Sequence, residues 1–191
     1  MTADRVQALI NALAKLPPYV GPVFRGTNLP ADIVEFYVPG ILVTEFAFVS
    51  TTADPASEFP VSTELEIFSR NGKSISALSV DPAEQEVLFP AYTTFEILGR
   101  EVDPVTGKTC LRLTDTGWLG GIDPSRAVAG KVFSTPDQLG IGVDRVPSDQ
   151  VTAMDRALAA ARAARKAVPR RKRIVRSDKF WDDLPGTGLD A

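Results

Sequence analysis

The sequence predicts an α+β domain in which about six or seven short strands follow one or two N-terminal helices, with a helical or flexible extension behind them. Three observations support this fold class. Apolar residues follow helical spacing near the N-terminus, in residues 6–16. Short runs rich in β-branched and aromatic residues, separated by turn residues, fill residues 23–114. Gly and Pro then interrupt any sustained period in residues 120–148, and an Ala-rich segment follows.

Two helices are expected on either side of a first strand. The apolar face of the first helix consists of Val6, Leu9, Ile10, Leu13 and Leu16. Thr2 is its candidate N-cap, and Pro17 ends it because proline cannot continue a helix. A short strand is expected at 23–26, and a second short helix begins around Pro30.

Further strands are expected at 41–50, 64–69, 73–78, 94–102 and 108–114. Residues 51–62 have the composition of a polar loop or a short helix. Asn71-Gly72 is a strong hairpin signal, so the strands on either side of it are expected to pair with each other. The domain is expected to end near Trp118.

Residues 84–90, EQEVLFP, place two glutamates directly before an apolar run. If these residues are extended, alternation with a period of two puts Glu84 and Glu86 on one face, with Gln85 behind them. Two like charges this close raise each other's pKa and weaken the fold unless the protein uses them. The pair is therefore a candidate functional site.

The C-terminal part is divided from its composition. Residues 149–167 are Ala-rich and predict a helix, with Ser148 or Asp149 as its cap. The expected organisation is a domain at 1–119, an extension or linker at 120–148, a helix at 149–168 and a basic flexible tail at 169–191.

Composition limits the available chemistry. Cys110 is the single cysteine of the 191 residues, and the chain contains no histidine. These two facts exclude an internal disulfide, cysteine zinc sites, Ser-His-Asp triads and histidine metal sites. Catalysis must therefore use carboxylates, hydroxyls, Lys, Arg or Tyr.

Charge is distributed unevenly along the chain. Residues 1–155 contain 11 basic and 20 acidic residues, whereas residues 156–191 contain 10 basic and 4 acidic ones. Residues 156–176 hold nine Lys and Arg and no acid. A solvated helix with a disordered basic end explains this pattern, and so does a contact with an acidic partner or a nucleic acid. Aromatic residues for base stacking are absent from 156–176, which disfavours recognition of single strands.

The N-terminus is not expected to be a signal peptide, and no segment is expected to span a membrane. Residues 2–16 carry polar residues where a signal peptide needs an apolar core, and no apolar run approaches 18 residues. The protein is expected in the cytoplasm, or delivered into the cytosol of a target cell by a route that needs no N-terminal signal peptide, and no membrane partner is expected.

Three short motifs occur in a distinctive order: VFRG with Arg25, FVSTT with Ser50-Thr51-Thr52, and EQE with Glu84 and Glu86. In order and flanking sequence they resemble the R-S-E class of mono-ADP-ribosyltransferases, over roughly residues 5–102. The third hydroxyl position is Thr52 where that family usually has Ser. The resemblance implies a mixed β-sandwich ADP-ribosyltransferase fold, with NAD as co-substrate and no metal.

The resemblance also implies residue roles. Glu86 matches the catalytic glutamate, expected to hold the ribose 2′-hydroxyl of NAD and to stabilise an oxocarbenium-like transition state. Ser50 is expected to orient Glu86, with Thr51 and Thr52 as further cofactor-binding positions on the same strand. Arg25 is expected to grip the NAD phosphates. The remaining cofactor-binding candidates are Gly26, whose backbone would approach the nicotinamide amide, and Phe59, which would pack on the nicotinamide ring or belong to the core.

Glu84 is the residue expected to act on the acceptor, the side chain that receives ADP-ribose. In the resembled family a glutamate at this position accompanies arginine modification, because a carboxylate can align a guanidinium and take its proton. The expected activity is transfer of ADP-ribose from NAD to an arginine of a target protein, as a toxin, effector or phage-type modifier, which allows for an immunity protein as a further partner. Two alternatives remain open: an NAD glycohydrolase, and a catalytically weak member that binds partners through its basic tail.

Overall fold

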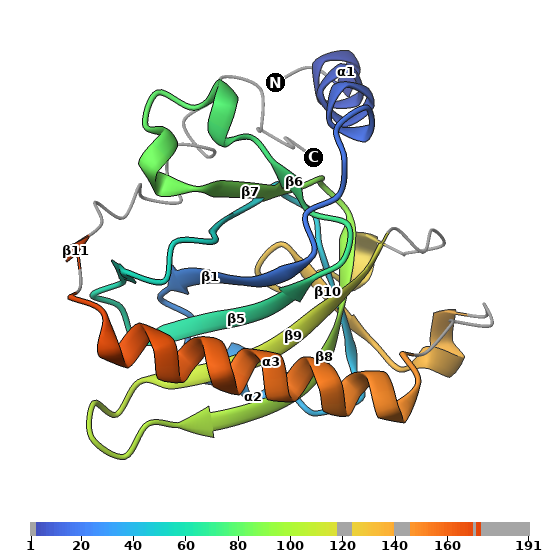
Figure 1. The fold of residues 1–191 in the computed structure, drawn as a ribbon. Helices are drawn as coiled ribbons and strands as arrows, with labels where there is room; N and C mark the ends of the chain where they lie inside the picture. The colour runs from blue at the N-terminus through green and yellow to red at the C-terminus, as the bar shows by residue number, and fades with distance from the viewer. Residues whose placement is uncertain (1–2, 118–123, 140–145, 170, 173–191) are drawn as a thin grey trace.

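The computed structural model describes residues 3–117, 124–139, 146–169 and 171–172. Their main element is a curled mixed sheet (Figure 1). In spatial order its strands are β10 (Lys131–Ser134), β2 (Leu42–Glu45), β8 (Thr93–Val102), β9 (Thr109–Gly117), β5 (Thr63–Ser69), β1 (Gly21–Thr27), β3 (Val49–Thr52), β7 (Glu86–Phe89) and β6 (Lys73–Ser74). The β5–β9 pair is parallel, and the other neighbours are antiparallel.

Helices and short turns surround this sheet. They are α1 (Ala3–Ala14), α2 (Ala31–Glu35), α3 (Ser148–Ala167) and the 3₁₀ turns η1 (Ser76–Leu78), η2 (Pro82–Glu84), η3 (Pro124–Arg126) and η4 (Pro136–Leu139). A separate parallel pair joins β4 (Ser57–Glu58) to β11 (Arg171–Lys172). The α+β fold class predicted from the sequence is therefore confirmed.

Period-two alternation of the strands builds the larger core. On β1, β5 and β9 the buried apolar residues Val23, Ile67 and Leu113 lie in adjacent register positions, so they form one continuous stripe. Tyr37, fully buried after α2, packs into this core. A second, smaller core lies under α1, where Leu13 packs with Leu88 of β7.

The opposite face of β1 and β5 lies under α3. Phe24, Glu64 and Glu66 alternate with the core residues and are almost fully buried. Helix α3 packs against β5, β1 and β9, as Figure 1 shows across the front of the sheet. Its buried side chains, Met154, Leu158 and Arg165, follow the i, i+4 and i+11 spacing of one helical face.

Several predicted elements are confirmed with small shifts of their bounds: the N-terminal helix, the short helix after Pro30, the helix at 149–167 and the strands at 94–102 and 108–114. The predicted cap of the last helix is wrong, because Pro147 is the N-cap and no side chain caps the helix. Thr2 lies outside the described residues. Strand β10 had no counterpart in the prediction, since a four-residue strand between turns gives no sustained period.

The predicted strand at 41–50 is wrong. It consists of two strands, β2 and β3, that occupy distant positions in the sheet: β2 lies between β10 and β8, whereas β3 lies between β1 and β7. Between them the chain bends, and the Phe46 amide donates to the Gly130 carbonyl at 3.1 Å instead of continuing the ladder. A continuous apolar run does not reveal such a change of partner.

The predicted hairpin around Asn71-Gly72 is also wrong. After β5 the chain turns, but β6 pairs with β7 rather than with β5, and residues 76–78 form η1. The turn is held by the buried carboxylate of Asp115, which accepts the Arg70 amide at 2.5 Å and the Asn71 side-chain amide at 2.8 Å. Burial raises the pKa of Asp115. The turn after β5 is therefore stabilised by hydrogen bonds to an acidic residue on β9 that is distant in sequence.

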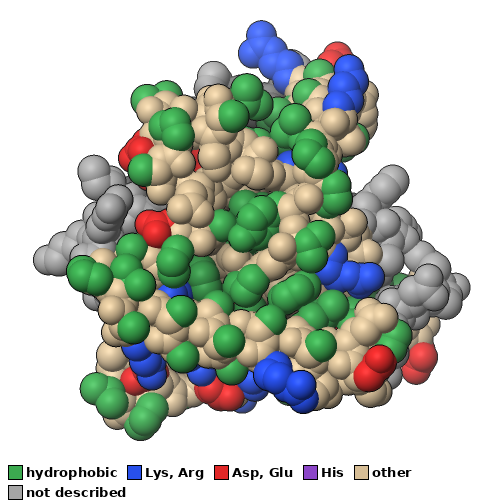
Figure 2. Space-filling model, in the orientation of Figure 1, with side chains coloured by type: hydrophobic (Ala, Val, Ile, Leu, Met, Phe, Trp, Pro, Cys, Tyr) green, Lys and Arg blue, Asp and Glu red, His purple; other side chains and the backbone are tan. Residues whose placement is uncertain are grey.

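The surface in the orientation of Figure 1 is divided by side-chain type. Figure 2 shows apolar side chains across the middle of this face and charged ones along the lower edge, beside α3. Within the described ranges, no helix combines the length and the apolar character that crossing a membrane requires.

Candidate active site

Three of the predicted site residues lie together. The Ser50 hydroxyl donates a 2.5 Å hydrogen bond to Oε1 of Glu86, and Arg25 Nη1 donates to the Ser50 carbonyl at 3.0 Å. All three side chains are half-buried. The structure thus brings together a guanidinium, a hydroxyl and a carboxylate from strands that are 25 and 36 residues apart in sequence.

The sheet is arranged so that these residues meet. Strand β1 pairs with β5 along its whole length, from Gly21 to Thr27, whereas it is in register with β3 at Phe24 and Thr52. Thr52 is in turn paired with Glu86 on β7. Strands β1, β3 and β7, which carry Arg25, Ser50 and Glu86, are therefore neighbours in the sheet.

Glu84 does not lie on the strand of Glu86. It is the last residue of η2, and Gln85 then adopts a left-handed conformation, with φ 46° and ψ 48°. The prediction that Glu84 and Glu86 alternate along one strand is therefore wrong. The turn is favoured locally, since Pro82 opens it and the Asp81 carboxylate accepts the Ala83 amide at 3.0 Å.

Thr52 holds this turn in place. Its hydroxyl donates to the Glu84 carbonyl at 2.5 Å, and the Ala53 amide donates to the Gln85 carbonyl at 3.0 Å. Thr52 is fully buried, so its hydroxyl acts on the backbone of the turn. Thr51 is 1% exposed and donates to the Val87 carbonyl at 2.7 Å, which fastens β3 to β7.

Gly26 and Phe59 are in close contact. A Cβ atom added to Gly26 would lie 2.3 Å from Cβ and 2.5 Å from Cγ of Phe59. The space beside the Gly26 backbone is therefore filled by Phe59, which is 5% exposed. The two residues predicted to contact the nicotinamide half of NAD thus adjoin each other, and the glycine is required for Phe59 to lie there.

A cavity of about 400 Å³ adjoins Arg25. Besides Arg25, its wall includes Tyr37, Glu45 and Lys131, which the sequence did not identify. Lys131 Nζ lies 2.8 Å from Oε2 of Glu45. The Tyr37 hydroxyl is buried and has no hydrogen-bond partner among the described residues. Burial, and then the nearby Glu45, raise the pKa of Tyr37 well above its ordinary value, so this hydroxyl remains a donor.

No sequence signal identified this wall, because Lys131 is on the unpredicted strand β10 and reaches Glu45 across 86 residues of sequence. In the part of the chain that the structure describes, no three acidic or cysteine side chains are grouped so that they could hold a metal ion.

Parts of known proteins are similar to part of this sequence. The profile of the family described as NAD:arginine ADP-ribosyltransferase matches residues 5–116. A protein named as a candidate NAD(+)–arginine ADP-ribosyltransferase, Mav of Mycobacterium avium (strain 104), is 47% identical over 115 residues, which are 58% of this chain and 14% of that protein. The NAD(+)–protein-arginine ADP-ribosyltransferase Tre1 of Serratia proteamaculans (strain 568) is 40% identical over 90 residues, 47% of this chain and 20% of Tre1. The chain thus matches a small part of each relative's length.

A solved structure shares the fold. The type III effector XopAI of Xanthomonas axonopodis pv. citri superposes with a TM-score of 0.52 and 31% identity, over 58% of this chain and 51% of the effector. The residues matched by the family profile include the strands that carry Arg25, Ser50 and Glu86, since these lie within 5–116. Helix α3 lies outside that range.

Proposed function

The chain belongs to the NAD:arginine ADP-ribosyltransferase family, and from this premise we propose that it transfers the ADP-ribosyl group of NAD to an arginine side chain of a target protein. The bond between the nicotinamide nitrogen and C1′ of the ribose breaks, and a bond between C1′ and a guanidinium nitrogen forms. Nicotinamide leaves with the electron pair of the broken bond, and the guanidinium gives up one proton.

The 2.5 Å hydrogen bond between Ser50 and Glu86, beside Arg25, is the observation that carries the proposal. Cleavage of a glycosidic bond passes through an oxocarbenium-like transition state, which a fixed carboxylate stabilises. Ser50 fixes one carboxylate oxygen of Glu86 and leaves the other for the ribose 2′-hydroxyl. The hydroxyl therefore serves to hold the carboxylate in one orientation before the substrate arrives.

Arg25 is proposed to bind the diphosphate of NAD. A guanidinium is always charged, and its planar fork fits phosphate oxygens. Arg25 donates to the Ser50 carbonyl and also lines the cavity of about 400 Å³, so it joins the Ser50–Glu86 pair to that cavity. Lys131 and the Tyr37 hydroxyl, as donors on the cavity wall, suit the polar groups of the rest of NAD.

Glu84 is proposed to serve the acceptor. An arginine side chain is a poor nucleophile while it is fully protonated. A carboxylate on a turn outside the strand can align the guanidinium and accept its proton as it attacks C1′. The left-handed Gln85 separates Glu84 from the strand of Glu86, so the two carboxylates lie on different backbone elements.

Labelled NAD tests the proposal directly. The protein is incubated with NAD labelled in the adenylate half and with a cell lysate, and labelled protein bands and free ADP-ribose are both quantified. The expected result is labelled bands whose adduct maps to arginine. Free ADP-ribose without labelled bands would favour the NAD glycohydrolase. If the protein does not consume NAD, both enzymatic functions are refuted, and the catalytically weak binding module is the alternative that remains.

Variants of two glutamates control this assay. Glu86→Gln should abolish both transfer and hydrolysis, because the amide cannot stabilise the positive charge of the transition state. Glu35→Gln, on the exposed surface of α2, should keep the activity of the unchanged chain. An active Glu86→Gln protein would show that another residue is catalytic.

The setting of this activity is proposed from the relatives. XopAI is described as a type III effector, and Tre1 as a protein-arginine ADP-ribosyltransferase. We propose that this chain likewise acts on proteins of a target cell. Expression of the unchanged chain in a bacterial cytosol should slow growth, and Glu86→Gln should relieve that effect.

A further inference from the structure

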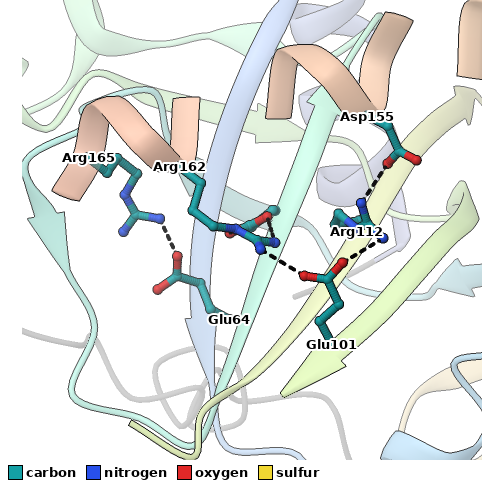
Figure 3. Close-up of polar contacts among 7 residues, drawn as sticks. Glu64, Glu101, Arg112, Asp155, Arg162 and Arg165 are labelled. Carbon is teal, nitrogen blue, oxygen red and sulfur yellow. Dashed lines mark hydrogen bonds and ion pairs between the residues drawn. The ribbon is translucent and has the colours of Figure 1, made fainter. Parts of the chain in front are cut away.

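Helix α3 is attached to the sheet by arginines rather than by apolar packing alone. Figure 3 shows Arg162 and Arg165 directed from α3 toward carboxylates of the sheet. Arg162 forms a bidentate pair with Glu66, at 2.8 and 2.6 Å, and a further hydrogen bond with Glu101 at 2.9 Å. The hydrogen bond from Arg162 lowers the pKa of Glu101. Two of the nine basic residues in 156–176 thus find their acidic partners within the domain.

Arg165 makes a different set of contacts. Its Nη1 donates to Glu64, its Nη2 donates to the Ser57 carbonyl at 2.8 Å, and its guanidinium carbon lies 4.0 Å from the centroid of the Phe24 ring. The side chain is 5% exposed. Because the buried side chain is shielded from water, a hydrogen bond from its charged guanidinium is stronger than one at the surface. Arg165 therefore fastens the backbone at Ser57 to the sheet.

The segment that follows Ser57 carries Phe59. Lys108 Nζ donates to the Phe59 carbonyl at 2.7 Å and lies 3.6 Å from Oε2 of Glu64. Strand β11 adds a second attachment, because Arg171 and Lys172 pair with Ser57 and Glu58. Arg165, Lys108 and strand β11 thus all contact the backbone of the segment at residues 57–59.

We propose that Arg165 is a positioning residue for the NAD site, which acts by holding the backbone at Ser57 so that Phe59 stays against Gly26. The inference rests on the proposed function, and on the expectation from the family resemblance that Gly26 and Phe59 contact the nicotinamide half of NAD. It gives α3, which lies beyond the residues matched by the family profile, an indirect part in substrate binding.

Paired substitutions test this without leaving a buried charge alone. Arg165→Met with Glu64→Gln removes the contact to Ser57, and Arg162→Met with Glu66→Gln is the matched control on the same helix face. Both remove one arginine and neutralise its carboxylate, but the control pair makes no contact with residues 57–59 in the described structure. Unfolding temperatures of both proteins report the common loss of helix docking.

Two measurements separate positioning from docking. The Arg165 pair should raise the KM for NAD and the inhibition constant of nicotinamide about tenfold, as expected for the loss of one hydrogen bond from a charged group, with kcat changed less than about twofold. Hydrogen exchange of the amides in 54–61 should become about tenfold faster. In the control, Arg162→Met with Glu66→Gln, the KM for NAD, the inhibition constant of nicotinamide and the exchange rates of 54–61 should stay near those of the unchanged chain.

The outcomes are distinct. Equal KM values and equal exchange in the two paired variants would overturn the inference, because α3 would then act only through its docking. An unchanged chain that does not bind NAD in calorimetry would refute the proposed function itself, and with it the role of Arg165 in NAD binding.

Discussion

The Ser50 hydroxyl donates to the Glu86 carboxylate at 2.5 Å, although the two residues are 36 positions apart on β3 and β7. The hydroxyl proton is thereby committed to one carboxylate oxygen. Thr52, two residues further along β3, donates to the backbone of the neighbouring turn. One strand therefore holds both the Glu86 side chain and the Glu84 backbone, and the predictions below separate these two tasks.

Removal of the Ser50 hydroxyl should reduce kcat. Ser50→Ala leaves Glu86 without its partner, and the loss of a hydrogen bond to a charged group corresponds to about 10- to 100-fold in rate. The measurement is nicotinamide release at saturating NAD. Ser148→Ala, at the start of α3, is the control. Unchanged turnover in Ser50→Ala would show that the carboxylate is held by other groups.

Loss of the Glu84 carboxylate should separate transfer from hydrolysis. Glu84→Gln removes the group proposed to take the arginine proton, and positioned bases contribute about 100-fold or more. Transfer to an arginine peptide should fall by that factor, whereas NAD hydrolysis, which depends on Glu86, should persist. Intact arginine transfer in Glu84→Gln would contradict the acceptor role.

A methyl group at Gly26 should disturb Phe59. In Gly26→Ala the new Cβ atom would lie 2.3 Å from Cβ and 2.5 Å from Cγ of Phe59, which is closer than van der Waals contact allows. Overpacking of this kind costs about 1–3 kcal/mol of unfolding free energy, measurable by urea denaturation. The penalty should shrink when Gly26→Ala is made in a Phe59→Gly protein, which lacks both the Cβ and the Cγ of Phe59. Additive effects of the two substitutions would show that the contact is absent in solution.

The reactivity of Cys110 should report the docking of α3. Burial, and then the nearby Glu66, raise the pKa of this thiol to about 11, and the thiol adjoins Arg162 under α3. Because the thiolate is the reactive form, native Cys110 should react with a disulfide reagent at pH 8 about a hundredfold more slowly than an ordinary cysteine.

The same pKa sets a pH dependence of stability. The raised native pKa means that the unfolded chain loses the thiol proton first, so the contribution of Cys110 to stability is present below about pH 9 and falls as the pH rises toward about 11. The test of helix docking returns to the reaction of Cys110 with the disulfide reagent at pH 8. Deletion of residues 148–191, which removes α3, should make the thiol react as fast as an ordinary cysteine. Equally slow reaction after the deletion would show that α3 does not cover it.

Local patterns in the sequence were sufficient for part of the fold. The N-terminal and C-terminal helices and the strands at β8 and β9 are long and strongly patterned, and each was predicted close to its final bounds. The strand at 41–50 and the hairpin at Asn71-Gly72 were not, because both depend on a partner far away. Asp115 redirects the turn from 44 residues away, and a local pattern does not encode such a contact.

The sequence by itself determined the kind of chemistry, because the absence of histidine and the order of the Arg25, Ser50 and Glu86 motifs restrict the site to a guanidinium, a hydroxyl and carboxylates. The tertiary structure alone decided how these groups are arranged. It placed Glu84 on a separate turn through the left-handed Gln85, and it turned the basic Arg165 inward to Glu64, 101 residues away. A charge pattern along a chain gives the sign of each group, whereas the partner of each charge is set by which surfaces pack together when the sheet curls and α3 docks.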